Sequence, residues 1–131
     1  MPYAKLPSFL LALSFTVASA ALHADEPITE LSYGKTTSLP QLTQTVNGLN
    51  AWAENELAEH ETEGLFKSRA DEQAIIRQTI ALAQQALAQA RHAEKQGDSV
   101  TARANYYAAE AIANYAAHMP HLLEDRLATN N

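Results

Sequence analysis

The residues best suited to hold a metal ion in this sequence are His118, Met119 and His121, which surround Pro120 in four consecutive positions. Imidazole nitrogen and thioether sulfur together suit copper, and imidazole alone suits copper, nickel or zinc. His92 could approach them from a neighbouring helix. We therefore treat these side chains as one candidate metal site. The alternative is an ordinary helix end, where His118 benefits from the helix dipole and His121 is solvated.

A second candidate is the acidic segment from Glu54 to Glu63, which His60 interrupts. Carboxylates in this number could bind a cation weakly or attract a basic partner. The segment lacks the Asp-x-Asp-x-Asp-Gly spacing of a calcium loop. A solvated helix end is therefore the favoured interpretation.

Aromatic side chains provide a third candidate, a surface for another protein. Tyr106 points to a different side of its predicted helix from Tyr107 and Tyr115, so we expect it to be exposed. With Tyr33 and Trp52 it forms a predicted partner-binding set, since amphipathic rings suit protein interfaces. The same tyrosines would also suit the rim of an alanine-rich core.

No motif indicates catalysis. The sequence has no Gly-rich phosphate loop, no nucleophile elbow and no His-Glu-x-x-His helix. Its adjacent carboxylate pairs, such as Asp71-Glu72 and Glu124-Asp125, point apart on a helix. We therefore expect a protein without enzymatic activity.

The candidate residues must be positioned by helices. A first helix is predicted over about residues 39–62, with Ser38 as N-cap and Pro40 in its first turn. Its apolar stripe consists of Leu39, Leu42, Val46, Leu49, Ala53 and Leu57. A second helix is predicted over about 68–96, beginning near Ser68 and ending at Gly97. Its stripe consists of Ile75, Ile76, Thr79, Ala83, Ala86, Leu87, Ala90 and Ala93.

A third helix is predicted over about 99–118, because the residue before Pro120 avoids helical dihedrals. Its apolar set consists of Val100, Ala104, Tyr107, Ala108, Ala111, Ile112 and Tyr115. Residues 121–128 could add a short fourth helix. Gly97 makes the second and third helices an antiparallel hairpin, across which the first must pack. The expected fold is all-α, a three- or four-helix bundle, and a homodimer would complete an insufficient core.

The N-terminal residues 1–24 have the order of a secretory signal peptide: Lys5, an apolar run from Leu6 to Val17, then small residues. Cleavage could follow Ala20 or Ala24, and a retained anchor is the alternative. We predict an extended arm or linker at 25–38 and the helical bundle domain at 39–131. The expected location is periplasmic or secreted, without stable membrane insertion after cleavage.

The composition excludes several classes of protein. The chain has 131 residues, fifteen acidic against nine basic, for a net charge of −6. This balance argues against partners with dense negative charge, namely nucleic acids and anionic lipids. The chain has no cysteine, which excludes disulfides, thiolate metal sites and covalent haem.

The segment from Ile75 to His121 resembles small periplasmic metal-binding proteins built from Ala- and His-rich helical hairpins. The matching residues are Ala86-Leu87-Ala88-Gln89-Ala90-Arg91-His92-Ala93, Gly97, Ala108-Ala109-Glu110-Ala111-Ile112 and His118. In that family histidine recurs on nearly every turn, whereas Gln89, Asn105 and Asn114 stand here. The resemblance therefore implies a helical hairpin, with metal binding limited to His92, His118 and His121.

Two functions follow from the sequence. The first is a non-enzymatic, exported accessory factor that binds another envelope protein. The alternative is a periplasmic buffer or chaperone for copper, nickel or zinc. The first needs no cofactor, and the second needs the ion itself.

Overall fold

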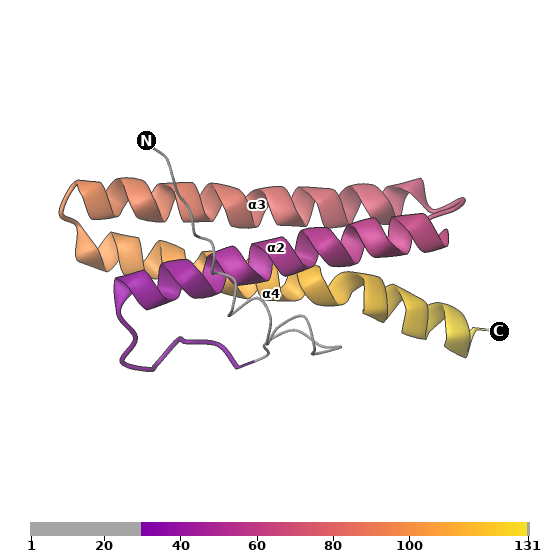
Figure 1. Ribbon diagram of the computed structural model, residues 1–131, viewed down its shortest axis with the longest axis horizontal. Helices are drawn as coiled ribbons and strands as arrows, with labels where there is room; N and C mark the ends of the chain where they lie inside the picture. Colours follow the sequence, from indigo (N-terminus) through magenta and orange to yellow (C-terminus); the bar gives the residue numbers. More distant parts are fainter. Residues whose placement is uncertain (1–29, 131) are drawn as a thin grey trace, which may run out of the picture.

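The computed structural model describes residues 30–130, which contain three helices and no strand. The helices are α2 (Leu39–Glu63), α3 (Ala70–Lys95) and α4 (Ser99–Thr129). Helices α3 and α4 form a hairpin, and α2 packs along it (Figure 1). The predicted all-α bundle is thus confirmed in its three-helix form. The predicted signal peptide, and residues 25–29 of the predicted arm, lie outside the described residues.

Helix α2 begins where its sequence predicts. The Ser38 hydroxyl accepts a hydrogen bond from the Gln41 backbone N–H, and the Gln41 side chain accepts one from the Ser38 N–H. This capping box satisfies two N–H groups that the helix itself leaves free. The helix ends at Gly64, whose φ of 87° is the left-handed conformation that glycine adopts most easily.

The hairpin turn is also as predicted. Gly97 has a φ of 79°, and the Asp98 carboxylate accepts a hydrogen bond from the Thr101 N–H at 3.1 Å to begin α4. The predicted start of α3 at Ser68 is wrong. Ser68 has a left-handed φ of 65°, so α3 begins at Ala70. In the preceding turn, the Phe66 side chain is buried in the core.

The predicted end of the third helix before Pro120 is wrong as well. Helix α4 continues through Pro120 to Thr129, so residues 121–128 belong to it and form no fourth helix. A proline inside a helix removes one hydrogen bond and costs about 3 kcal/mol. Here the Pro120 ring is fully buried and Leu123, one turn later, is also buried. Burial of these turns offsets the lost hydrogen bond.

The core is a stack of side chains at alternating steps of three and four residues, the spacing of coiled-coil packing. It begins near the hairpin turn, continues through Leu49, Ala83 and Ala113, and ends around Leu57, Ile76 and Ile80. Alanines at the centre allow close approach of the backbones. Among residues 30–130, no helix has the length and hydropathy that a membrane span requires.

The buried face of α4 differs from the predicted one. Val100 and Tyr115 are 79% and 57% exposed, so they lie outside the core. The buried positions of α4 are instead Ala102, Tyr106, Ala109, Glu110, Ala113, Ala116, Ala117, Pro120 and Leu123. Alanine occurs on every side of this helix, so the pattern of apolar residues alone did not identify the buried side.

Residues 30–38 lie against α4. The buried Glu110 carboxylate accepts hydrogen bonds from the Ser32 N–H at 2.9 Å and from its hydroxyl at 2.7 Å. The Tyr33 ring contacts the Tyr107 ring edge-on at 5.5 Å. Arg103 donates to the Thr37 carbonyl at 2.5 Å. These contacts hold the chain close to α4 before α2 begins.

Candidate metal centre

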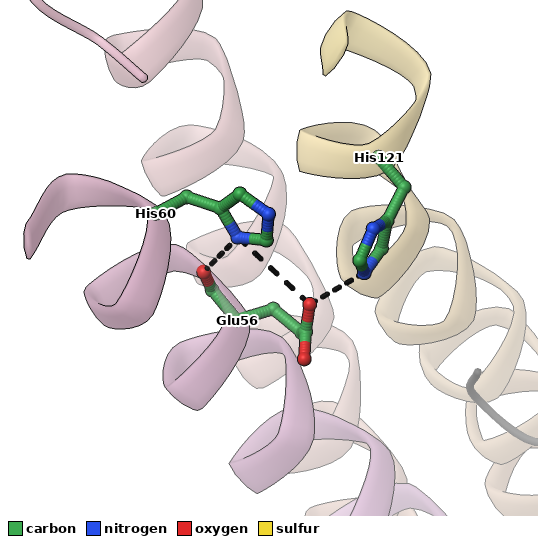
Figure 2. A group of neighbouring side chains, drawn as sticks. All are labelled: Glu56, His60 and His121. Atoms are coloured by element: carbon green, nitrogen blue, oxygen red, sulfur yellow. Dashed lines mark hydrogen bonds and ion pairs between the residues drawn. The ribbon is translucent and has the colours of Figure 1, made fainter. Parts of the chain in front are cut away.

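Two histidines and two glutamates meet where the end of α2 lies beside the last turns of α4. Glu56 and His60 come from α2, and His121 and Glu124 come from α4. Figure 2 shows Glu56 between the two imidazole rings. The rings are perpendicular, with centroids 5.0 Å apart. We call these four side chains the His–Glu cluster.

Local helix geometry positions the first pair. The core stripe of α2 runs through Val46, Leu49 and Ala53, and its next steps of three and four residues are Glu56 and His60. Both side chains are therefore directed inward, and they are only 8% and 4% exposed. The interpretation of this segment as a solvated helix end is wrong for these two residues.

The orientation of His60 is fixed by its own helix. Its Nδ1 lies 2.8 Å from the Glu56 carbonyl oxygen, which has no proton to give, so Nδ1–H is the donor. The lone pair is then on Nε2, which lies 3.3 Å from Glu124 Oε1. His60 thus presents a nitrogen ligand toward a carboxylate of α4.

His121 is held from the other side by the same glutamate. Its Nε2 lies 2.5 Å from Glu56 Oε1, and its Nδ1 lies 3.5 Å from Glu124 Oε1. His121 Nε2 and Glu56 Oε1 are both buried and have no hydrogen-bond partner, so their contact is a close ion-pair approach without hydrogen-bond geometry. A buried carboxylate oxygen is costly without such a partner. The other ring nitrogen, His121 Nδ1, lies toward Glu124.

The surroundings of His60 shift its pKa. Burial by itself lowers the pKa, but the hydrogen bond to the Glu56 carbonyl and the negative charges of Glu124 and Glu56 raise it. The net result is a pKa above the ordinary 6.5. The cluster therefore favours a positive charge between its carboxylates, which a proton or a metal ion can supply.

The distances suit an ion coordinated by nitrogen and oxygen. With bonds of about 2.0–2.1 Å, a tetrahedral zinc ion separates its ligand atoms by roughly 3.3 Å. His60 Nε2 and His121 Nδ1 lie 3.3 and 3.5 Å from Glu124 Oε1, close to this separation. Glu63 can place a carboxylate oxygen within 4.8 Å of the ligand atoms of His60 and Glu124.

Glu56 has a different part in this arrangement. It also offers a ligand atom within 4.8 Å of both histidines. Its 2.5 Å contact with His121 Nε2, however, is shorter than the separation between two ligand atoms of one tetrahedral ion. Glu56 therefore orients both rings, as carboxylates and carbonyls commonly do behind metal-bound histidines.

The residues predicted to bind metal are not gathered in one place. His121 belongs to the His–Glu cluster, but His118 Nδ1 is bonded to the Asn114 carbonyl at 2.8 Å. Met119 packs against the apolar end of the core. His92 is exposed near the hairpin turn. The structure thus separates the thioether and two of the three imidazoles from the cluster.

The predicted partner-binding residues lie in three different environments. The expected exposure of Tyr106 is wrong: it is 1% exposed, and its hydroxyl donates a 2.6 Å hydrogen bond to Glu94. Trp52 is half-buried against the core. Tyr33 is 78% exposed beside Tyr107. They form no common surface.

Sequence reasoning placed Glu56 and His60 in a segment that could bind a cation weakly but favoured a solvated helix end, and it did not consider Glu124 as a metal ligand. The stripe of α2 contained the signal for the first two, because its own step continues from Ala53 to them. The position of Glu124 could not be predicted in the same way, because it depends on α4 continuing past Pro120.

The comparisons with known proteins leave this site to be interpreted from its geometry. No family model, no curated protein and no solved structure matches the chain.

Proposed function

We propose that this protein binds one divalent transition-metal ion, zinc, copper or nickel, at the His–Glu cluster. The proposed ligands are His60, Glu124 and Glu63, whose ligand atoms lie within 4.8 Å of one another, and His121, whose ligand atom lies within 4.8 Å of those of His60 and Glu56. Glu56 orients both rings. The observation that supports this most is that one nitrogen of each imidazole lies near the same Glu124 carboxylate oxygen, at 3.3 and 3.5 Å, between two helices.

The ligand types limit which metal ions can bind at this site. Two imidazoles with carboxylates suit zinc, copper(II) and nickel(II), whereas calcium and magnesium prefer oxygen alone. A thioether would favour copper(I), but the Met119 side chain is partly buried against the apolar end of the core. Glu63 and Glu124 are exposed, so an ion can enter and leave from solvent.

The proposed role is that of a metal buffer or carrier rather than an enzyme. The ion joins the end of α2 to the last turns of α4, and exposed carboxylates allow exchange. The signal-peptide pattern of residues 1–24 supports a location in the cell envelope.

Equilibrium dialysis against Zn²⁺ with a competing chelator tests this function. We expect one ion per chain for the unmodified protein and a loss of affinity of more than a hundredfold in His60→Gln and in His121→Gln. Glu56→Gln should weaken binding by roughly 10–100-fold, the usual effect of removing an orienting group. His92→Gln and His118→Gln are the matched controls and should bind normally. Equal losses in the controls and the cluster variants would refute the assignment.

A further inference from the structure

The hairpin of α3 and α4 carries a second set of residues at steps of three and four, beside the set that faces α2. On α3 this set consists of Ile75, Thr79, Leu82, Ala86, Gln89 and Ala93, and on α4 of Thr101, Asn105, Ala108, Ile112, Tyr115, Met119, Leu122 and Arg126. Ala86 and Ala93 also belong to the core. Four of its large apolar members, Ile75, Leu82, Tyr115 and Leu122, are 51–57% exposed. We call this set the outer seam.

The outer seam is hollowed at both ends. One hollow of about 520 Å³ is lined by Ile75, Tyr115, Met119 and Leu122. The other, of about 460 Å³, lies near the hairpin turn and is lined by Gln89, His92 and Asn105. A seam with coiled-coil spacing and an open groove can accept further helices.

We propose that a second copy of this chain covers the outer seam, forming a homodimer about a two-fold axis parallel to the helices. Such an axis places α3 of one copy opposite α4 of the other at the same height. Every neighbouring pair among these four helices is then antiparallel. This is the arrangement of an up-down four-helix bundle, in which each seam is buried by its symmetry mate.

The rim of the larger hollow carries charges of both signs. Glu72 on α3 and Asp125 and Arg126 on α4 all line the hollow, so each copy contributes two carboxylates and one guanidinium. In the described part of a single chain, Glu72 and Arg126 form no ion pair. The two-fold axis brings Arg126 of each copy opposite Glu72 of the other, once on each side. The same axis brings Ile75 opposite Tyr115 and Leu122 of the second copy, so apolar residues meet apolar residues.

Sedimentation equilibrium of the purified protein in the presence of a chelator tests the dimer independently of metal binding. We expect twice the mass of one chain at tens of micromolar, with dissociation on dilution. The double variant Tyr115→Lys/Leu122→Lys should be monomeric and still helical by circular dichroism. Val100→Lys is the control, since Val100 is 79% exposed but lines neither hollow. A monomer at all concentrations, or a dimer that survives the double variant, would overturn the proposal.

Exchanging the charges tests the symmetry itself. Glu72→Arg and Arg126→Glu should each weaken the dimer several-fold, because each places like charges across the two-fold axis. The combination of both should restore the original affinity. A combined variant weaker than either single one would exclude the proposed arrangement.

Discussion

Zinc at a hundred times its dissociation constant should raise the melting temperature by roughly 10–20 °C. A ligand that binds only the folded state at this excess stabilises it by about 2.7 kcal/mol. Each kcal/mol shifts the melting temperature of a domain of this size by about 4–8 °C. The double variant His60→Gln/His121→Gln should show no shift, whereas His92→Gln/His118→Gln should respond like the unmodified protein. Thermal melts followed by circular dichroism measure the effect.

The shift should also depend on pH. The folded pKa of His60 is raised above 6.5, so its proton stabilises the metal-free fold below pH 6.5, and this stabilisation is lost as pH rises through the folded pKa. Zinc must displace this proton, so its effect should be larger at pH 8 than at pH 6. A zinc shift independent of pH, or greater at pH 6, would indicate binding away from the His–Glu cluster.

Replacing Tyr106 by alanine should destabilise the fold by about 3–5 kcal/mol, a large fraction of the roughly 5–15 kcal/mol typical of a domain. Tyr106 is among the largest fully buried side chains, and its hydroxyl hydrogen bond to Glu94 would also be lost. Urea denaturation monitored by circular dichroism gives the difference in unfolding free energy.

Two other tyrosine variants separate the causes of this loss. Tyr106→Phe keeps the ring and should cost about 0.5–1.5 kcal/mol, because Glu94 is exposed and water can replace the lost hydrogen bond. Tyr33→Ala should cost less than about 1 kcal/mol, because Tyr33 is largely exposed. If Tyr106→Ala were as stable as Tyr33→Ala, the core assigned to α4 would be wrong.

The sequence predicted helix ends wherever a local signal determines them. Ser38 with Gln41 begins α2, and Gly97 with Asp98 closes the hairpin, as short-range hydrogen bonds and a left-handed glycine require. Pro120 predicted the end of a helix, whereas α4 continues through it. Its preference is local, and burial of Pro120 and Leu123 against other helices outweighs it.

The candidate site was harder to predict because it forms between helices. The apolar pattern of α2 continues from Ala53 to Leu57. The polar residues Glu56 and His60 lie on the same inward side, but the sequence favoured a solvated position for them. Only the packing of α2 beside α4 shows that Glu56 and His60 meet His121 and Glu124. Closeness in sequence, as of His118 and His121, did not predict which side chains form the candidate site. The packing of the helices determines it.

The most direct test of the metal site is NMR of the imidazole nitrogens during a zinc titration. We predict that His60 Nε2 and His121 Nδ1 change resonance together and saturate at one equivalent of zinc. The signals of His92 and His118 should stay in place. If His118 or His92 responds first, or if the His60 and His121 nitrogens stay unchanged at saturation, the His–Glu cluster is not the metal site.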